Sequence, residues 1–310
     1  MTVLLDPTND VVFKIMFSRP DSTDLLVSLL TAVLRPPSPI SEVTLLNAAL
    51  DKNSITDRGV VLDLHLRLED RSQINVEMQA RRISGMRERA VYHVARMYGS
   101  AIVRGQLYSE LAPCAGIFLL GYDELPSARF HSTFRLLEVH DHVPLSPQIE
   151  IHFVELLKLR RMAPSDWTQE SALADWARFF RPVDERDREE LAMKDPVFTK
   201  ACKVLAQVSE DPDAQYLARA REEGEVLWAH EVAVNRREAR DDGLREGRDE
   251  GLREGRVTGL AQSVSRVLEA RGFPLSNEIR ERIDRCSDPA LLERWLARAA
   301  VANSIDAVFE

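Results

Sequence analysis

The chain has 310 residues, of which 41 are Lys or Arg and 50 are Asp or Glu, and its formal net charge is −9. Its 45% hydrophobic content is typical of a globular protein, and no apolar run reaches the ~18 residues of a membrane span. The three cysteines form no CxxC pair, which excludes a disulfide framework and a thiolate zinc site. We therefore expect a cytoplasmic protein with no membrane partner.

Two helices open the chain. Thr8 or Asn9 can cap the first, which has Phe13 on its apolar side, and Pro20 ends it. A second helix can start at Ser22 and continue until the proline-rich segment 35–40. Together they predict a helical layer before the first strands.

Strands follow in the next hundred residues. Residues 60–68 and 74–80 alternate between apolar and polar side chains, which is typical of half-buried strands. A helical pattern covers 84–111, and apolar or alternating segments at 115–120, 130–139 and 149–155 predict further strands. The sequence thus predicts an α/β domain over 1–160, with a mixed sheet flanked by helices.

The two alternating strands bring acidic side chains together. In a hairpin around residues 70–72, the apolar faces of the two strands coincide only when odd-numbered residues pair with odd-numbered ones and even with even. Two registers meet this condition. One places Asp63 opposite Glu77, and the other places it opposite Gln79 with Glu77 on the diagonal. Both bring the carboxylates close enough to share a divalent cation such as magnesium. The alternative is an ordinary solvent-facing polar surface.

Charged residues on neighbouring segments strengthen the case for a site. Asp10 and Lys14 lie four apart on the first helix, so they can pair with each other or face the same site. Five arginines follow Glu77 and Gln79, and three of them recur every seven residues, so on a helix those three would form one cationic stripe. Such a stripe can hold phosphates, and the alternative is an ordinary solvated helix face. These arginines are Arg81, Arg82, Arg87, Arg89 and Arg96.

The C-terminal half is expected to be helical throughout. Residues 161–260 form a helical extension that ends in a charged repeat with glycine at every fourth position from Gly243 to Gly259. This repeat is either a helical stripe that a second helix can approach closely or a flexible charged linker. Residues 261–310 predict a small helical domain. His140 and His142 lack a third metal ligand at recognisable spacing, so a polar turn is the simpler interpretation.

Four ordered segments resemble the Rpn recombination-promoting nucleases, also described as transposases, of the PD-(D/E)XK nuclease superfamily. They are DPTNDVVFKIMF, VVLDLHLRLEDRSQINVEMQ, RERAVYHVARMYGSAIVRGQLYSEL and IHFVELLKL. The resemblance implies a restriction-endonuclease-like fold followed by an all-helical C-terminal region. The last fifty residues look like a small helical domain of unknown function.

The same resemblance implies roles for individual residues. Asp63 and Glu77 match the two motif acids, which bind Mg²⁺, with Mn²⁺ as the alternative ion. Gln79 stands where the superfamily usually has lysine, so it could orient water or ligate the metal but cannot act as a base. Asp10 matches an acidic residue that the first helix lends to such sites, and Lys14 is the candidate for a relocated lysine.

The sequence therefore predicts a magnesium-dependent DNA endonuclease of a bacterial cell, linked to recombination or mobile elements. DNA is its expected partner, and the helical tail is expected to form a homo-oligomer. The alternative is a catalytically weak or inactive relative that binds DNA or acts as a scaffold, which the Gln79 substitution and the acidic total favour. A transposase proper is less well supported, because no separate DNA-reading module is evident.

Overall fold

The computed structural model describes residues 3–47, 63–102 and 105–310. Two compact units make up the chain, residues 1–227 and residues 228–310. The first part of the predicted strand at 60–68 lies outside the described residues.

The first unit alternates helices and strands. Its elements are α1 (Asp10–Ser18), η1 (Pro20–Ser22), α2 (Thr23–Leu34), β1 (Val43–Leu45), β2 (Leu64–Leu68), β3 (Gln73–Gln79), α3 (Met86–Ser100), η2 (Tyr108–Glu110), β4 (Cys114–Leu120), β5 (His131–Arg135), β6 (Ile149–Glu155), η3 (Leu159–Arg161), η4 (Pro164–Glu170), α4 (Ser171–Phe180), α5 (Glu185–Lys194), α6 (Pro196–Glu210) and the first turns of α7 (Pro212–Ala270). The η labels mark single 3-10 turns or short 3-10 helices.

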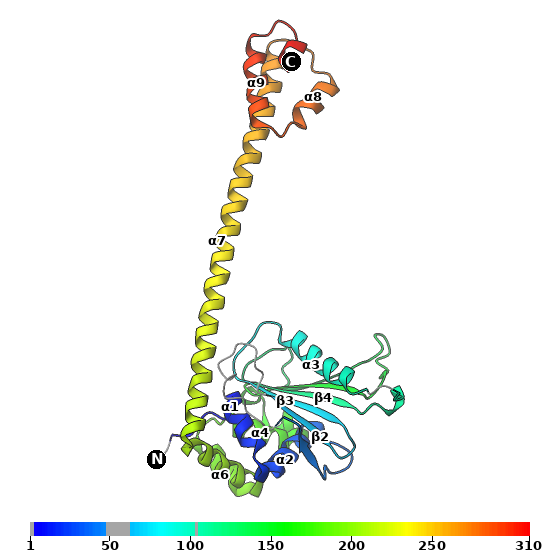
Figure 1. Cartoon of the computed structure of the whole chain (residues 1–310), viewed down its shortest axis with the longest axis vertical. Coiled ribbons are helices and arrows are strands. Elements are labelled where there is room, and N and C mark those ends of the chain that lie inside the picture. Colours follow the sequence, from blue (N-terminus) through cyan, green and yellow to red (C-terminus); the bar gives the residue numbers. More distant parts are fainter. Residues whose placement is uncertain (1–2, 48–62, 103–104) are drawn as a thin grey trace. The chain divides into compact units, whose positions relative to one another are not determined.

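The strands form one mixed six-stranded sheet in the order β1-β2-β3-β4-β6-β5 (Figure 1). Pairing is parallel between β3 and β4 and between β4 and β6, and it is antiparallel elsewhere. A parallel neighbour requires a crossover connection, and α3 supplies the one between β3 and β4. The predicted fold class, a mixed sheet flanked by helices and followed by a helical region, is confirmed.

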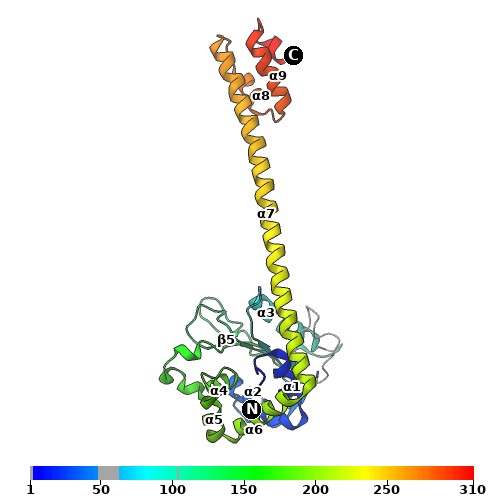
Figure 2. The same cartoon turned by 90° about the vertical axis from the view of Figure 1, so that its left-hand side faces the viewer.

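Helices cover the sheet unequally on its two faces. The even-numbered apolar residues of β2 and β3 pack against α1, α2 and the cluster of α4, α5 and α6 (Figure 2), in one continuous core. On the other face, α3 packs on β4 and β6 through contacts such as Met86 with Phe118. Gly116 lets α3 approach closely, because a Cβ there would lie 2.5 Å from Val94 Cγ2. The polar face of the β2–β3 hairpin is left beside α3, and the candidate site forms there.

Two features of the first unit differ from expectation. The helix predicted over 84–111 ends at Ser100, and only the short η2 follows. Gly99 weakens the helix near this end, and Gly105 has a φ of +92°, a left-handed conformation that glycine adopts readily. Strand β1, which pairs with β2, was not predicted, because three residues carry too little alternation to be recognised.

The second unit is entirely helical. Its elements are the end of α7, α8 (Asn277–Asp284), α9 (Pro289–Val301) and α10 (Asp306–Phe309). Buried side chains of all four helices form a small core around Trp295, whose ring meets that of Phe309 edge to face at 5.0 Å. The glycine repeat is helical, so the alternative of a flexible linker is wrong. Apart from the adjoining residues and nearby backbone of its own helix, a Cβ built at any of these five glycines would meet no described atom within 4 Å.

Candidate active site

The β2–β3 hairpin sets the register of the two motif acids. Leu64 pairs with Val76 and Leu66 with Ile74, so the same ladder, extended by one residue, places Asp63 opposite Glu77. The loop has an odd number of residues, because the Leu68 amide donates to the Ser72 carbonyl at 3.0 Å. The structure therefore adopts the first of the two expected registers.

Asp63 lies just before β2, and a side chain from the β1 end holds it there. Asn47 Nδ2 donates to the Asp63 carbonyl at 3.0 Å and to its carboxylate Oδ1 at 3.2 Å. Asn47 Oδ1 in turn accepts from the His65 backbone amide at 2.8 Å. The half-buried Asp63 carboxylate is thereby oriented by a residue that sequence reasoning did not identify. No motif or periodicity marks Asn47 in the chain.

Glu77 is a buried carboxylate with few stabilising partners. Its side chain is 3% exposed, and within the described part of the chain neither oxygen accepts a hydrogen bond. Arg89 Nε lies 3.3 Å from Oε1. Burial raises the pKa of Glu77 to about 7; the positive charge of Arg89 opposes this, and the negative charges of Asp63 and Asp10 add to it. A divalent cation would supply the positive charge that ionised Glu77 lacks in its buried position. The Asp63 and Glu77 carboxylates therefore suit a metal that prefers oxygen ligands.

Helix α1 brings two more charged groups to this place. Asn9 caps the helix by accepting from the Val11 amide at 3.0 Å. Asp10 is buried, and its charge acts on Glu77. Lys14 is 4% exposed; burial lowers its pKa, while the charge of Asp63 works in the opposite direction. Lys14 is thus electrostatically coupled to Asp63, and Asp10 to Glu77; that Asp10 and Lys14 address one site stays a prediction.

A contact from the start of α7 completes the surroundings of Asp10. Arg221 Nε lies 3.1 and 3.0 Å from the two carboxylate oxygens, and its Nη2 lies 2.7 Å from Oδ2. Burial raises the pKa of Asp10, and Arg221 opposes that rise. Nearby, Glu225 pairs with Arg81 at 3.5 Å. Arg221 is a site residue that the sequence did not indicate, because it is more than two hundred positions from Asp10.

Comparison with known families decides the identity of this fold. A family model described as PD-(D/E)XK nuclease family transposase matches residues 7–234. The chain belongs to this family. Searches of curated proteins and of solved structures each found no match. Membership indicates a nuclease linked to mobile elements, and the matched range contains the whole sheet, the hairpin acids and Arg221.

Gln79 occupies the position after Glu77 on the polar face of β3 in this nuclease-family fold. It is half-buried, and its amide Nε2 donates to the Arg81 carbonyl at 3.1 Å. The amide oxygen is the group that could ligate a metal or orient a water. The assignment of a role to Gln79 stays a prediction.

The expected stripe of Arg82, Arg89 and Arg96 is wrong as a single helical face. Helix α3 begins at Met86, after Gly85 with a φ of +74°, so Arg82 precedes the helix. Arg89 and Arg96 do lie on the side of α3 that faces the hairpin, since Arg89 pairs with Glu77 and Arg96 lines a cavity beside Asp63.

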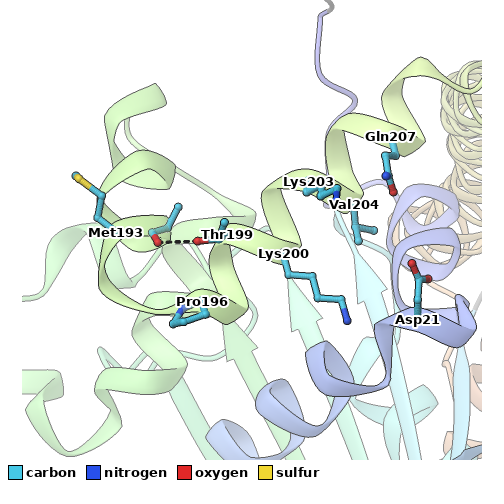
Figure 3. Close-up of a pocket in the computed structure, with 9 residues that line it drawn as sticks. Asp21, Met193, Pro196, Thr199, Lys200, Lys203, Val204 and Gln207 are labelled. Carbon is cyan, nitrogen blue, oxygen red and sulfur yellow. Dashed lines mark hydrogen bonds between the residues drawn. The ribbon is translucent and has the colours of Figure 1, made fainter.

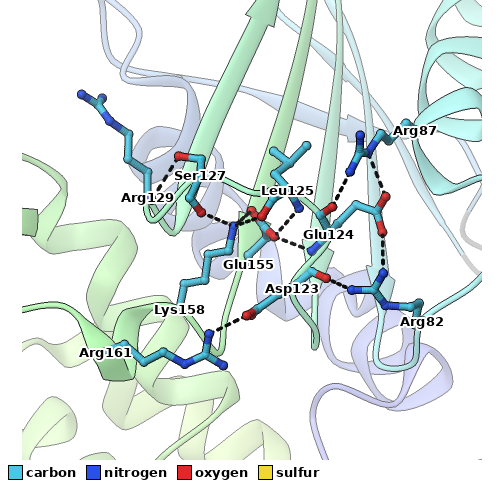
Figure 4. Close-up of polar contacts among 10 residues, drawn as sticks. All are labelled: Arg82, Arg87, Asp123, Glu124, Leu125, Ser127, Arg129, Glu155, Lys158 and Arg161. Atoms are coloured by element: carbon cyan, nitrogen blue, oxygen red, sulfur yellow. Dashed lines mark hydrogen bonds and ion pairs between the residues drawn. The ribbon is translucent and has the colours of Figure 1, made fainter.

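Arg82 and Arg87 engage the loop after β4 (Figure 4). Arg87 Nε lies 3.0 Å from the Glu124 carboxylate, and Arg82 lies 4.0 Å from the same carboxylate. Arg82 also donates to the Asp123 carbonyl. The prediction that these two arginines bind nucleic acid stays a prediction, but their present contacts stabilise this loop.

A buried ion pair holds the other side of that loop (Figure 4). Lys158 Nζ lies 2.6 Å from Glu155 Oε2, and both side chains are almost fully buried. Glu155 also accepts from the amides of Glu124 and Leu125, and Lys158 donates to the carbonyls of Leu125 and Ser127. The two charges thus compensate each other and also form hydrogen bonds with the loop backbone. These contacts give Glu155 and Lys158 a structural role.

The cavities in the described part of the first unit include the following three. One of about 450 Å³ borders Asp63 and α3. A second, of about 570 Å³, lies beside Lys158 and Arg161. The third, of about 480 Å³, runs along α6, and Thr199, Lys200 and Lys203 are among the residues that line it (Figure 3). Lys200 Nζ also pairs with Asp24 at 2.6 Å. Only the first contains a predicted site residue.

None of the described helices has the length and apolar character that a bilayer crossing requires.

Proposed function

We propose that the protein is a divalent-metal-dependent DNA endonuclease in which Asp63 and Glu77 hold Mg²⁺, or alternatively Mn²⁺. The observation that carries this is the position of Asp63, just before β2, where the extended ladder places it opposite Glu77 on β3; Glu77 is buried, and neither of its oxygens accepts a hydrogen bond in the described chain. Charge repulsion raises the pKa of Glu77, together with the larger effect of burial. Such an arrangement costs free energy unless a cation binds to it.

Each nearby side chain then has a defined task. A bound Mg²⁺ would activate a water for in-line attack on the phosphodiester and stabilise the leaving oxygen. Asn47 orients the Asp63 carboxylate, and Arg89 neutralises part of the charge on Glu77. Lys14, which is buried and electrostatically coupled to Asp63, would orient the water and offset charge on the phosphate. Gln79 would assist through its amide oxygen.

The arrangement around Asp10 supports an indirect role. Its carboxylate already receives two nitrogens of Arg221, so it is held in place rather than open to a further ligand. We infer that Asp10 acts on the hairpin acids through its charge and through the position that it gives to α1.

Plasmid nicking tests the proposal. Wild-type protein should nick supercoiled DNA with Mg²⁺ or Mn²⁺ and not with EDTA, and Asp63→Asn and Glu77→Gln should each lose this activity. Glu88→Gln, an exposed position on α3, is the matched control and should cut like wild type. Nicking that persists in both site variants would reveal a contaminating enzyme.

The second candidate is a weak or inactive relative that binds DNA as a scaffold. It is favoured by Gln79, whose amide cannot take a proton from water. A scaffold would bind DNA equally well with or without metal and with Asp63→Asn. Clean wild-type protein that nicks under no metal condition would make this candidate the better one.

We further propose a cytoplasmic location in a bacterial cell, where the three free thiols would stay reduced, and self-association through the glycine repeat of α7. The location is inferred from the composition and the cysteines, and the self-association from the regular spacing of the glycines. Analytical ultracentrifugation of the full chain, with Gly251→Glu as the disrupting variant, should give a dimer or larger assembly for wild type only.

A further inference from the structure

The cavity of about 450 Å³ beside Asp63 is formed by the hairpin and α3. His65 and Asn75, which pair with each other in the β2–β3 ladder, supply the strand side, and His93, Arg96 and Ser100 are among the residues on the helix side. Asp63 belongs both to this wall and to the proposed metal pair. A ligand bound in the cavity would therefore lie next to the DNA phosphate that the proposed metal ion binds.

Asn75 is the unusual member of the wall. The residue is 3% exposed, and its Nδ2 donates to no acceptor in the part of the chain that the structure describes. A buried amide donor without an acceptor is unfavourable by about 1–3 kcal/mol. Since the side chain borders the cavity, a ligand there that accepts hydrogen bonds would remove this cost.

The charge on the helix side is positive. Arg96 is exposed, and it forms no ion pair with a carboxylate in the described residues, in contrast to Arg81, Arg82, Arg87 and Arg89. Burial and the charges of Arg89 and Arg96 lower the pKa of His93, while Asp63 raises it. A guanidinium and an unpartnered amide thus converge on one space, with the His93 ring between the helix and the strands.

This set of donors selects the chemistry of the ligand. Asp63 is the only acidic residue that lines the described cavity, and a metal held by Asp63 and Glu77 would cancel its repulsion of an anion. No Phe, Tyr or Trp is among the lining residues, and the two imidazole rings, those of His65 and His93, offer a smaller stacking surface than the large aromatic rings on which bases usually stack. A phosphate accepts hydrogen bonds from an amide and a guanidinium and matches both observations.

We propose that this cavity binds an internucleotide phosphate of the DNA strand, next to the phosphate at the metal, through the Arg96 guanidinium and the Asn75 amide. The proposal rests on the nuclease function. In it, the Arg96 guanidinium contacts the phosphate as a charged group, and the Asn75 amide donates a hydrogen bond to it as a neutral one. Arg96 and Asn75 are therefore positioning residues for the substrate.

DNA binding without turnover tests this assignment. Anisotropy of a labelled duplex is measured with Ca²⁺ in place of Mg²⁺ over a series of KCl concentrations, for wild type, Arg96→Gln and Asn75→Leu. Arg135→Gln is the matched control, because Arg135 is also exposed but pairs with Glu150 on β6 and is not one of the arginines predicted to contact DNA. We expect about tenfold weaker binding for each cavity variant. The slope of log K against log salt should fall by about 0.9 for Arg96→Gln and stay unchanged for Asn75→Leu and Arg135→Gln.

Several outcomes would overturn the proposal. Arg96→Gln that binds like wild type removes the phosphate contact, and this conclusion does not depend on the fold of Asn75→Leu because Arg96 is exposed. Weaker binding with an unchanged salt slope would mean that Arg96 contacts a base or the protein instead. An equal fall of the slope in Arg135→Gln would mean a diffuse charge effect.

The same variants separate this proposal from the nuclease function. If wild type nicks DNA and Arg96→Gln binds with an unchanged slope, the phosphate site fails and the nuclease stands. If wild type nicks under no condition but Arg96→Gln shows the smaller slope, the phosphate site stands on a protein that only binds DNA.

Discussion

Replacing Glu77 by glutamine should make the metal-free protein more stable while it removes the proposed activity. The folded protein holds the Glu77 proton up to a pKa of about 7, whereas an unfolded glutamate loses it near its ordinary value of 4.5. Between these two values the folded state binds more protons than the unfolded state, so its stability falls as pH rises. The difference between the two pKa values corresponds to a loss of about 3 kcal/mol in the free energy of unfolding at high pH. Glu77→Gln carries no ionisable group at this position and therefore does not suffer that loss.

Urea unfolding in EDTA measures this effect. We expect Glu77→Gln to exceed wild type in free energy of unfolding by about 3 kcal/mol at pH 8 and by only about 1 kcal/mol at pH 5, where wild-type Glu77 is protonated. Mg²⁺ should raise the melting temperature of wild type at pH 8 and leave that of the variant unchanged. A variant that is less stable at pH 8, or a difference that does not vary with pH, would refute the view of Glu77 as a buried, poorly compensated charge.

Four further substitutions test the site and the buried ion pair beside the loop after β4. Lys14→Met should abolish nicking while DNA binding persists, and adding Gln79→Lys should restore part of the activity if Lys14 replaces the superfamily lysine; no recovery would argue against that replacement. Arg221→Ala should destabilise the protein by about 3 kcal/mol in urea, because it leaves Asp10 buried without its cation, and an unchanged midpoint would mean that the pair is unimportant. Lys158→Met should cost about 3–5 kcal/mol by leaving its buried carboxylate partner on β6 unpaired, and a calorimetric melt like that of wild type would contradict this.

The central part of the site was predictable because strand alternation is a local signal. The apolar residues of the two strands fix which side chains share a face, and that parity limited Asp63 to two partners, Glu77 or Gln79. The structure selects between them through the length of the loop, which the Leu68 to Ser72 hydrogen bond defines. A turn of this kind leaves no unambiguous mark in the sequence.

The contacts that support the acids were not predictable, because they join segments distant along the chain. Asn47 reaches Asp63 from β1, and Arg221 reaches Asp10 from α7. Each is a single polar residue, and nothing in its own segment of the sequence indicates its distant partner, so only the packing of the start of α7 against α1 reveals Arg221. The end of α3 was predicted wrongly for another reason. The helical spacing of apolar residues continues past Ser100, but Gly99 and Gly105 interrupt the helix.

The hairpin register also determines which insertions and deletions the gene can tolerate. An extra codon in the exposed turn after Leu68 would lengthen the loop and leave the ladder, and therefore both carboxylates, in place. An extra codon between Ile74 and Glu77 would keep every acid in the translated product and yet turn Glu77 toward the apolar helices. Length variation among natural alleles should accordingly be confined to the turn, so the ladder position of Glu77 is a better guide to activity than its distance from Asp63 along the chain.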